Sequence, residues 1–163
     1  AIGIIDLGAH VAKLYIVRNG ILERIHRVTA GGVNITKKLA VLRDISFAEA
    51  EDLKRTCSKD SQYLADTRKA TQSILEDPLL EFKRIISLYE DRLGDSLSNI
   101  ILVGGVSVGF GTDTYVTDVL QSQVVIGNPF EKVGYPVVME DLLRDIGPSF
   151  APSLGAALRT LSD

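Results

Sequence analysis

The order of apolar and polar positions predicts strands at the start of the chain. Apolar residues dominate Ile2–Asp6 and Leu14–Val17, while polar and apolar residues mix along Ile21–Thr29. Asn19-Gly20 separates the second run from the third, and this dipeptide is typical of a tight β-hairpin turn. The beginning of the chain is therefore predicted to form a three-stranded meander.

Helical patterns follow the meander. Residues 34–42 are predicted to be helical, and a second helix is expected to begin after Ser46. Glu49 lies three positions after Ser46, so the two residues can form a capping box. Residues 57–76 show a weaker, polar pattern that also favours helix.

A long amphipathic helix is predicted next. Pro78 is expected to be its first residue, because proline suits the first helical position, and Gly94 is expected to end it. Large apolar residues recur at helical spacing between these ends and are predicted to lie in the core: Leu79, Phe82, Ile86, Tyr89 and Leu93.

The remainder of the chain alternates strands and helices. The expected elements, in order, are a strand at 100–103, a helix at 112–121, a strand at 124–126, a loop from 128 and helices at 139–146 and 151–161. Strands in a meander, then helices, then a strand–helix–strand unit indicate an α/β layered fold.

Composition limits the classes of protein and partner. The chain has 163 residues, 45% of them apolar, and a net charge of −3 without a basic cluster, so a folded domain is expected and nucleic-acid binding is not. Cys57 is the single cysteine, which excludes an internal disulfide and fits a reducing, cytoplasmic setting. No apolar run reaches the roughly 20 residues that a membrane span needs. The chain begins at Ala1, which fits either a fragment or removal of an initiator Met.

Glycine-rich turns follow apolar runs at three places. They are Asp6-Leu7-Gly8-Ala9, Ala30-Gly31-Gly32 and Gly104-Gly105. Glycine lets backbone amides approach a phosphate closely, and a helix that begins behind the turn adds partial positive charge. None of the three turns matches a P-loop or a complete GxGxxG motif, and each on its own is also compatible with a plain turn.

Taken in order, the motifs resemble those of the actin-like ATPases, in particular the bacterial PilM and FtsA branch. The stretch "IIDLGAHVAKLYIVRNGILERIHRVTAGGVNITKKLA" resembles the second phosphate motif and its hairpin, and "ISFAEAEDLKR" resembles a helix with an Ala-Glu-x-x-Lys motif. "SLYEDRLGDSLSNIILVGGVSVGFG" resembles the long helix and the adenosine motif. "VVIGNPFEKV" and "FAPSLGAALRTL" are similar to the end of PilM and favour it over FtsA.

The resemblance implies an α/β, actin-like (ribonuclease H-like) lobe with a mixed sheet, whose N-terminal three-stranded meander is flanked by helices. Residues 1–163 would form a single lobe, with residues of about 46–95 as a mostly helical insertion. This lobe would be the second of two, and ATP or ADP with Mg²⁺ would bind between it and the missing first lobe of the same chain.

The resemblance also assigns roles to the residues of the phosphate side. Asp6 would orient water or Mg²⁺ near the phosphates, and Gly8 would let its turn approach them. Gly31 and Gly32 would lie near the junction of the lobes. The alternative for Asp6 is a carboxylate that hydrogen-bonds its own turn.

Four further residues would contact the nucleoside. Glu51 and Lys54 would reach the ribose and the adenine edge, and Gly104 and Gly105 would pass under the nucleotide. The alternatives are a solvated helix pair for Glu51 and Lys54 and a tight strand-to-helix turn for the two glycines.

Several positions depart from the family pattern. Hydroxyl residues usually follow the Asp-x-Gly turn and donate to phosphate oxygens, whereas this chain has His10, Val11, Ala12 and Lys13 there. Val106 replaces the third glycine of the adenosine motif, and Phe110 replaces a proline. These departures indicate a degenerate nucleotide site and argue against ATP hydrolysis.

The favoured hypothesis is a cytoplasmic, PilM-like scaffold whose nucleotide biases partner binding. It would be peripheral to the inner membrane through its partners, the inner-membrane assembly proteins of a type IV pilus or a related secretion system. An isolated lobe is also expected to self-associate. The alternatives are a structural module without nucleotide, an FtsA-like division protein and an enzyme of the wider sugar kinase group.

Overall fold

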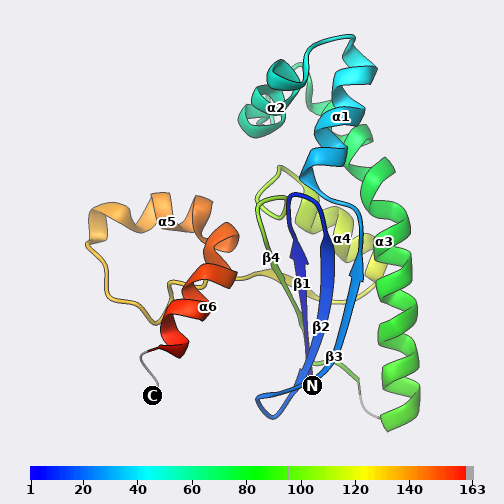
Figure 1. Ribbon diagram of the computed structural model, residues 1–163, viewed down its shortest axis with the longest axis vertical. Helices are drawn as coiled ribbons and strands as arrows, with labels where there is room; N and C mark the ends of the chain where they lie inside the picture. The colour runs from blue at the N-terminus through cyan, green and yellow to red at the C-terminus, as the bar shows by residue number, and fades with distance from the viewer. Residues whose placement is uncertain (95, 161–163) are drawn as a thin grey trace.

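The computed structural model describes residues 1–94 and 96–160 and contains one five-stranded mixed sheet (Figure 1). Its strands are β1 (Ile2–Leu7), β2 (Ala12–Arg18), β3 (Ile21–Val28), β4 (Ile100–Val103) and β5 (Val124–Ile126), in the order β3-β2-β1-β4-β5. The first three strands pair antiparallel, while β1–β4 and β4–β5 pair parallel. The predicted meander and mixed sheet are confirmed.

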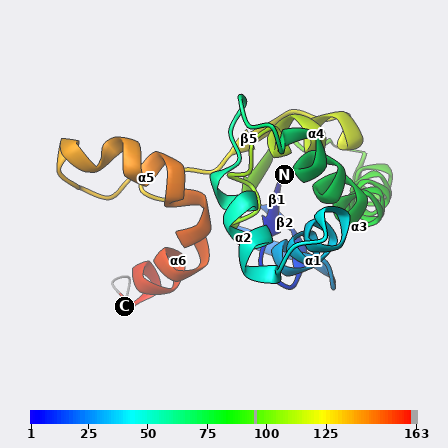
Figure 2. The ribbon, with the colours of Figure 1, turned by 90° about the horizontal axis from the view of Figure 1, so that it is seen from above.

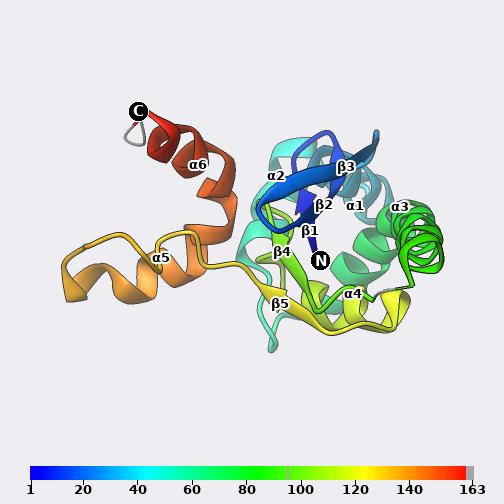
Figure 3. The same ribbon diagram turned by 90° about the horizontal axis from the view of Figure 1, so that it is seen from below.

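Strand alternation gives the sheet two different faces. On one face the side chains are completely or almost completely buried and form the core: Ile5, Leu7, Leu14, Ile16, Ile100 and Leu102. The intervening residues, such as Ile4, Tyr15 and Ile101, point to the opposite face. Among residues 1–94 and 96–160, no long helix covers that opposite face (Figures 1 and 3).

Helices α3 (Leu64–Leu93) and α4 (Thr112–Leu120) lie along the core face, whereas α1 (Gly32–Arg43) and α2 (Phe47–Thr56) lie beyond the carboxyl end of β1 (Figures 1 and 2). The apolar stripe of α3 packs in the core as predicted, with Leu79 and Phe82 fully buried. The capping box predicted for Ser46 and Glu49 is present at the start of α2, and Gly94 ends α3 with a left-handed φ of 63°.

A C-terminal arm lies to the side of the sheet (Figure 3). It contains the short helix η1 (Val137–Met139), α5 (Glu140–Ile146), η2 (Gly147–Phe150) and α6 (Ala151–Arg159). The Phe150 ring of this arm lies 6.2 Å, between centroids, from the Phe130 ring of the preceding loop. The sequence places the end of α6 at Leu161, which lies outside the described residues.

The expectation that Pro78 begins a helix is wrong. Pro78 lies in the middle of α3, a single helix of 30 residues that begins at Leu64. A proline inside a helix removes one backbone hydrogen bond and crowds the preceding turn. Pro78 is buried, and Leu75 and Leu79 on either side of it are fully buried in the core. Packing of these side chains therefore stabilises the helix across the proline.

Candidate functional site

Two of the predicted glycine turns are joined by backbone hydrogen bonds. The Gly8 amide donates to the Val11 carbonyl at 3.2 Å and closes the turn after β1. The Gly32 amide donates to the Gly8 carbonyl at 3.0 Å. The first turn of α1 is therefore attached directly to the turn that follows β1.

Gly31 is required by this close approach. A Cβ at Gly31 would lie 2.5 Å from the Gly8 carbonyl oxygen and 2.6 Å from the Ala9 carbonyl oxygen. Both neighbours are backbone atoms, which cannot rotate away as a flexible side chain could. The meeting of the two turns therefore depends on glycine at this position.

The third glycine turn reaches the same place from β4. Because β1 and β4 are parallel, their carboxyl ends lie at the same edge of the sheet. Gly104 has a φ of +92°, and a Cβ there would lie 2.6 Å from Asp6 Oδ1. The Val106 amide donates to the Leu7 carbonyl at 3.0 Å. The structure thus brings together Asp6 and all three glycine turns, which are far apart in the sequence.

Asp6 already has a cationic partner. Its side chain is nearly buried, and Lys13 Nζ lies 3.2 Å from Asp6 Oδ2. The hydrogen bond to Asp6, together with the negative charge of that carboxylate, raises the pKa of Lys13. Lys13 therefore places a positive charge directly beside the one carboxylate of the glycine turns.

Lys54 joins α2 to the start of α1. Its Nζ lies 3.1 Å from the Gly32 carbonyl oxygen, 2.7 Å from Thr36 Oγ1 and 2.6 Å from Glu51 Oε2. Burial raises the pKa of the Glu51 carboxyl, but hydrogen bonds from Lys54 and Thr36 and the nearby positive charges outweigh it, so the pKa of Glu51 is lowered overall. Glu51 and Lys54 form a fixed polar cluster against Gly32 rather than a solvated surface pair.

A cavity of about 1170 Å³ lies beside this cluster. Lys54 and Gly105 line it, together with the remainder of the loop 105–111 and the starts of α3 and α4. The cavity is also lined by Arg55, Arg68 and Tyr115, which no sequence motif indicated as site residues. For Arg55, its position directly after Lys54 was the one sequence feature that could have indicated a place in the site. Arg68 lies in a segment of weak pattern, and only the fold brings it to the cavity.

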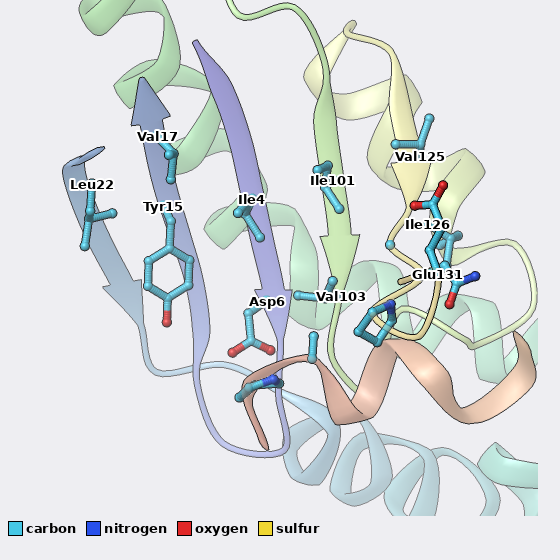
Figure 4. Close-up of a pocket in the computed structure, with 15 residues that line it drawn as sticks. Ile4, Asp6, Tyr15, Val17, Leu22, Ile101, Val103, Val125, Ile126 and Glu131 are labelled. Atoms are coloured by element: carbon cyan, nitrogen blue, oxygen red, sulfur yellow. The ribbon is translucent and has the colours of Figure 1, made fainter. Parts of the chain in front are cut away.

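A second cavity, of about 550 Å³, lies on the open face of the sheet (Figure 4). Its lining is mainly apolar and includes Tyr15, Val17 and Ile101, with Asp6 at the carboxyl end of β1 (Figure 4). Asp6 therefore borders this cavity, whereas Lys54 and Gly105 border the larger one. The predicted residues adjoin one another, but they do not all line one cavity.

The protein side chains of the site could hold a metal ion only if phosphate oxygens and water supplied most of its ligands. Among residues 1–94 and 96–160 there is no group of three His, Cys, Asp or Glu side chains that could hold a metal. Mg²⁺ commonly takes one or two protein carboxylates and completes its octahedron with phosphate oxygens and water. Asp6 could be one such ligand, in competition with Lys13.

Within the part of the chain that the structure describes, no helix is both long and apolar enough to cross a bilayer.

Solved structures with the same arrangement define the class of protein. The chain is similar to a protein of a PilM-PilN type IV pilus biogenesis complex, with a TM-score of 0.80, 27% identity and coverage of 97% of this chain and 45% of that one. It is similar in fold to ethanolamine utilization protein EutJ from Carboxydothermus hydrogenoformans (TM-score 0.70, 21% identity, 96% and 48% coverage). The strand order, the converging glycine turns and these similarities define an actin-like ATPase fold. Residues 1–161 match the family described as type IV pilus assembly protein PilM, and the chain belongs to this family.

Two further results complete the comparison. A search of curated proteins gives no significant match. The chain spans a little under half the length of the two similar structures, 45% and 48%. The family match supports the PilM branch over the FtsA alternative, as the loop at Asn128 and the last helix had indicated.

Proposed function

We propose that this chain is the second lobe of a PilM-like, actin-fold assembly protein of a type IV pilus or a related secretion system, and that it acts as a nucleotide-sensitive scaffold. The observation that carries the proposal is the convergence of three glycine turns beside a cavity lined by Lys54. Residues 1–163 form a single lobe in this proposal, with about 46–95 as its helical insertion. Its partner lobe would come from the same protein.

The nucleotide would be ATP or ADP. The turns at Gly8 and Gly31–Gly32 would take the phosphates, because glycine allows close approach of backbone amides. Glu51 and Lys54 would hold the ribose side, and Gly104 and Gly105 would pass under the nucleotide. Asp6 would be the protein ligand of Mg²⁺, which would supply charge neutralisation of the phosphates. One fold relative, an activator of 2-hydroxyisocaproyl-CoA dehydratase, was solved with bound ADPNP.

A route for nucleotide sensitivity runs through Gly104. On one side Gly104 lies so close to the end of β1 that an added Cβ would be 2.5 Å from the Leu7 carbonyl oxygen. On the other side its amide donates to the Pro148 carbonyl in the C-terminal arm at 2.8 Å. A ligand that shifts the glycine loop would therefore also bias the arm. Such a bias changes partner binding only if the partner distinguishes the two positions of the arm.

The partners would be inner-membrane assembly proteins. The similar PilM-PilN structure is described as a type IV pilus biogenesis complex, which supports a partner of that kind. The chain would then be cytoplasmic and peripheral to the inner membrane through these partners.

Calorimetry with Mg-ATP and Mg-ADP tests the nucleotide site. We expect the wild-type chain to bind Mg-ADP and Asp6→Asn to lose at least tenfold in affinity, because a charged metal ligand is removed. Asp52→Asn is the matched control, since Asp52 is an exposed carboxylate on α2 away from the glycine turns. Equal affinities of Asp6→Asn and Asp52→Asn would contradict a metal role for Asp6.

The second candidate is a structural module that has lost its nucleotide. The ion pair between Lys13 and Asp6 favours it, because the lysine already neutralises the carboxylate that Mg²⁺ would need. Val11 and Ala12 also offer no hydroxyl donors to a phosphate. Absence of binding by the wild-type chain at millimolar nucleotide would select this candidate and leave proteins as the ligands to identify.

A further inference from the structure

The ion pair between Asp6 and Lys13 presents its cation to the outside. The Asp6 side chain is only 8% exposed, whereas the Lys13 side chain is 36% exposed. Both carboxylate oxygens already face the protein, since Oδ2 accepts from Lys13 Nζ and Oδ1 lies 2.6 Å from the position of an added Cβ at Gly104. A ligand that approaches the turn at Gly8 therefore meets the lysine more readily than the carboxylate.

A second cation continues the same row across the sheet. Asp6 lies opposite Lys13 in the strand register, and Lys13 lies opposite Arg27. Residues directly opposite each other share one face of a sheet, and like charges in such positions are unfavourable. Within the described residues no salt bridge neutralises Arg27. The charged row, which we define as Asp6, Lys13 and Arg27, therefore has a cation in excess and suits an anion.

The charged row lies beside the turn that the proposed function gives to the phosphates. Asp6 is the last residue but one of β1 and Lys13 is the second residue of β2, so the turn at Gly8 connects them. Two cations and one carboxylate leave one net positive charge, which is also the charge that Asp6 with one Mg²⁺ would have. Side chains can therefore supply the charge that a divalent metal commonly brings to a nucleotide.

We propose that Lys13, together with Arg27, is a resident cation of the phosphate site and makes nucleotide binding independent of divalent metal. This inference rests on the proposed function for the nucleotide, and it gives Lys13 the charge that the proposed function gives to Mg²⁺. Lysine and arginine both form charge-assisted hydrogen bonds to phosphate oxygens. Asp6 then holds Lys13 in place, and its carboxylate becomes free for Mg²⁺ only when the lysine is removed.

The wild-type protein tests the inference without any substitution. We expect calorimetry to give affinities for ADP that agree within about twofold in excess Mg²⁺ and in EDTA. A site that depends on the metal would bind ADP at least tenfold more weakly in EDTA. Asp6→Asn weakens binding under either account, because it removes a metal ligand or releases Lys13, so the comparison in EDTA is the one that separates them.

Lys13→Met removes the positive charge and keeps the length of the side chain. We expect this variant to bind ADP about tenfold more weakly in EDTA and to recover most of the affinity in Mg²⁺, because Asp6 is then free for the metal. A merely structural lysine would not create a dependence on Mg²⁺ when it is removed. Lys69→Met is the matched control, since Lys69 is exposed on α3 and lines neither cavity.

Arg27→Gln tests the second cation at an exposed position, where a substitution leaves the core intact. We expect it to weaken ADP binding in EDTA about threefold, because the charged row then has no net charge. Arg24→Gln is the matched control, since Arg24 is exposed on the same strand but lies opposite Ile16, on the core face. Equal effects of the two substitutions would contradict a contact between Arg27 and the phosphates.

Each result has a distinct consequence. If the wild type binds ADP only with Mg²⁺, the inference is overturned while the proposed function stands. The same follows if Lys13→Met binds ADP in EDTA as tightly as wild type, because the cation would then lie elsewhere. If circular dichroism shows that Lys13→Met does not fold, the wild-type comparison and Arg27→Gln decide. Absence of ADP binding by the wild type in both conditions would overturn the proposed function and this inference with it.

Discussion

At the scale of single residues, glycines set how closely the turns of this protein can meet. Gly31 lies against two carbonyl oxygens, and Gly104 combines a positive φ with close contacts to Asp6 and Leu7. Gly105, which follows directly, has only Ser149 Cβ nearby, at 3.9 Å from an added Cβ. The surroundings therefore require glycine at Gly104, whereas an added Cβ at Gly105 would make only an ordinary van der Waals contact.

Gly31→Ala should lower the free energy of unfolding by about 2 kcal/mol, because the methyl group would overlap backbone atoms of the turn at Gly8. Gly105→Ala is the matched control, and its effect should stay within about 0.5 kcal/mol. Urea denaturation of both variants measures the difference. Equal stability of the two variants would show that the turn at Gly8 can move away.

At the scale of elements, the ends of the helices are fixed by local hydrogen bonds. Ser46 Oγ accepts from the Glu49 amide at 3.2 Å, and Glu49 Oε2 accepts from the Ser46 amide at 2.9 Å. The Ser46 hydroxyl and the Ser46 amide both donate to the Glu49 carboxylate, and these two hydrogen bonds lower the pKa of Glu49. The start of α2 matters for the site, because α2 carries Glu51 and Lys54.

Ser46→Ala should lower the free energy of unfolding by about 1 kcal/mol, since the Glu49 amide loses its acceptor, Ser46 Oγ. Ser73→Ala is the control, because Ser73 is exposed inside α3 and alanine favours helix there. Thermal and urea unfolding give both values. A loss as large for Ser73→Ala would contradict the role of the cap.

At the scale of the whole molecule, one face of the sheet carries exposed apolar residues. The edge strand β3 exposes 53% of Leu22 and 60% of Ile25, and Leu22 also lines the cavity of the open face. Edge strands and large apolar patches favour association with other chains. The sequence prediction of self-association therefore has a surface to which it can be assigned.

We expect the mass of the chain in light scattering to rise with concentration, and the double variant Leu22→Lys, Ile25→Lys to suppress the rise, because lysine on an edge strand opposes pairing. Val41→Lys is the control, since Val41 is 81% exposed on α1, which lies beyond the end of the sheet (Figure 1). A constant monomer mass for wild type would count against self-association. Equal suppression by Val41→Lys would place the contact elsewhere.

The sequence predicts correctly those features of the structure that depend on interactions between neighbouring residues. The hairpin at Asn19-Gly20, the cap at Ser46 and the end of α3 at Gly94 were all predictable, because each depends on a few neighbouring residues. Pro78 misled because tertiary packing outweighs the local cost of a proline within α3. Arg68 was missed as a lining residue of the larger cavity, because nothing in its local pattern indicates that α3 begins beside the loop 105–111.

The sequence by itself determined the order of strands and helices, the three glycine turns and their family, since these depend on local periodicity and on residue types at fixed spacing. Only the tertiary structure decided which groups meet. It paired Asp6 with Lys13, fixed Lys54 on Gly32, and placed Asp6 at one cavity and Gly105 at the other. The physical reason is that side-chain direction and the pairing of β1 with β4 involve residues far apart in the chain, which no local pattern specifies.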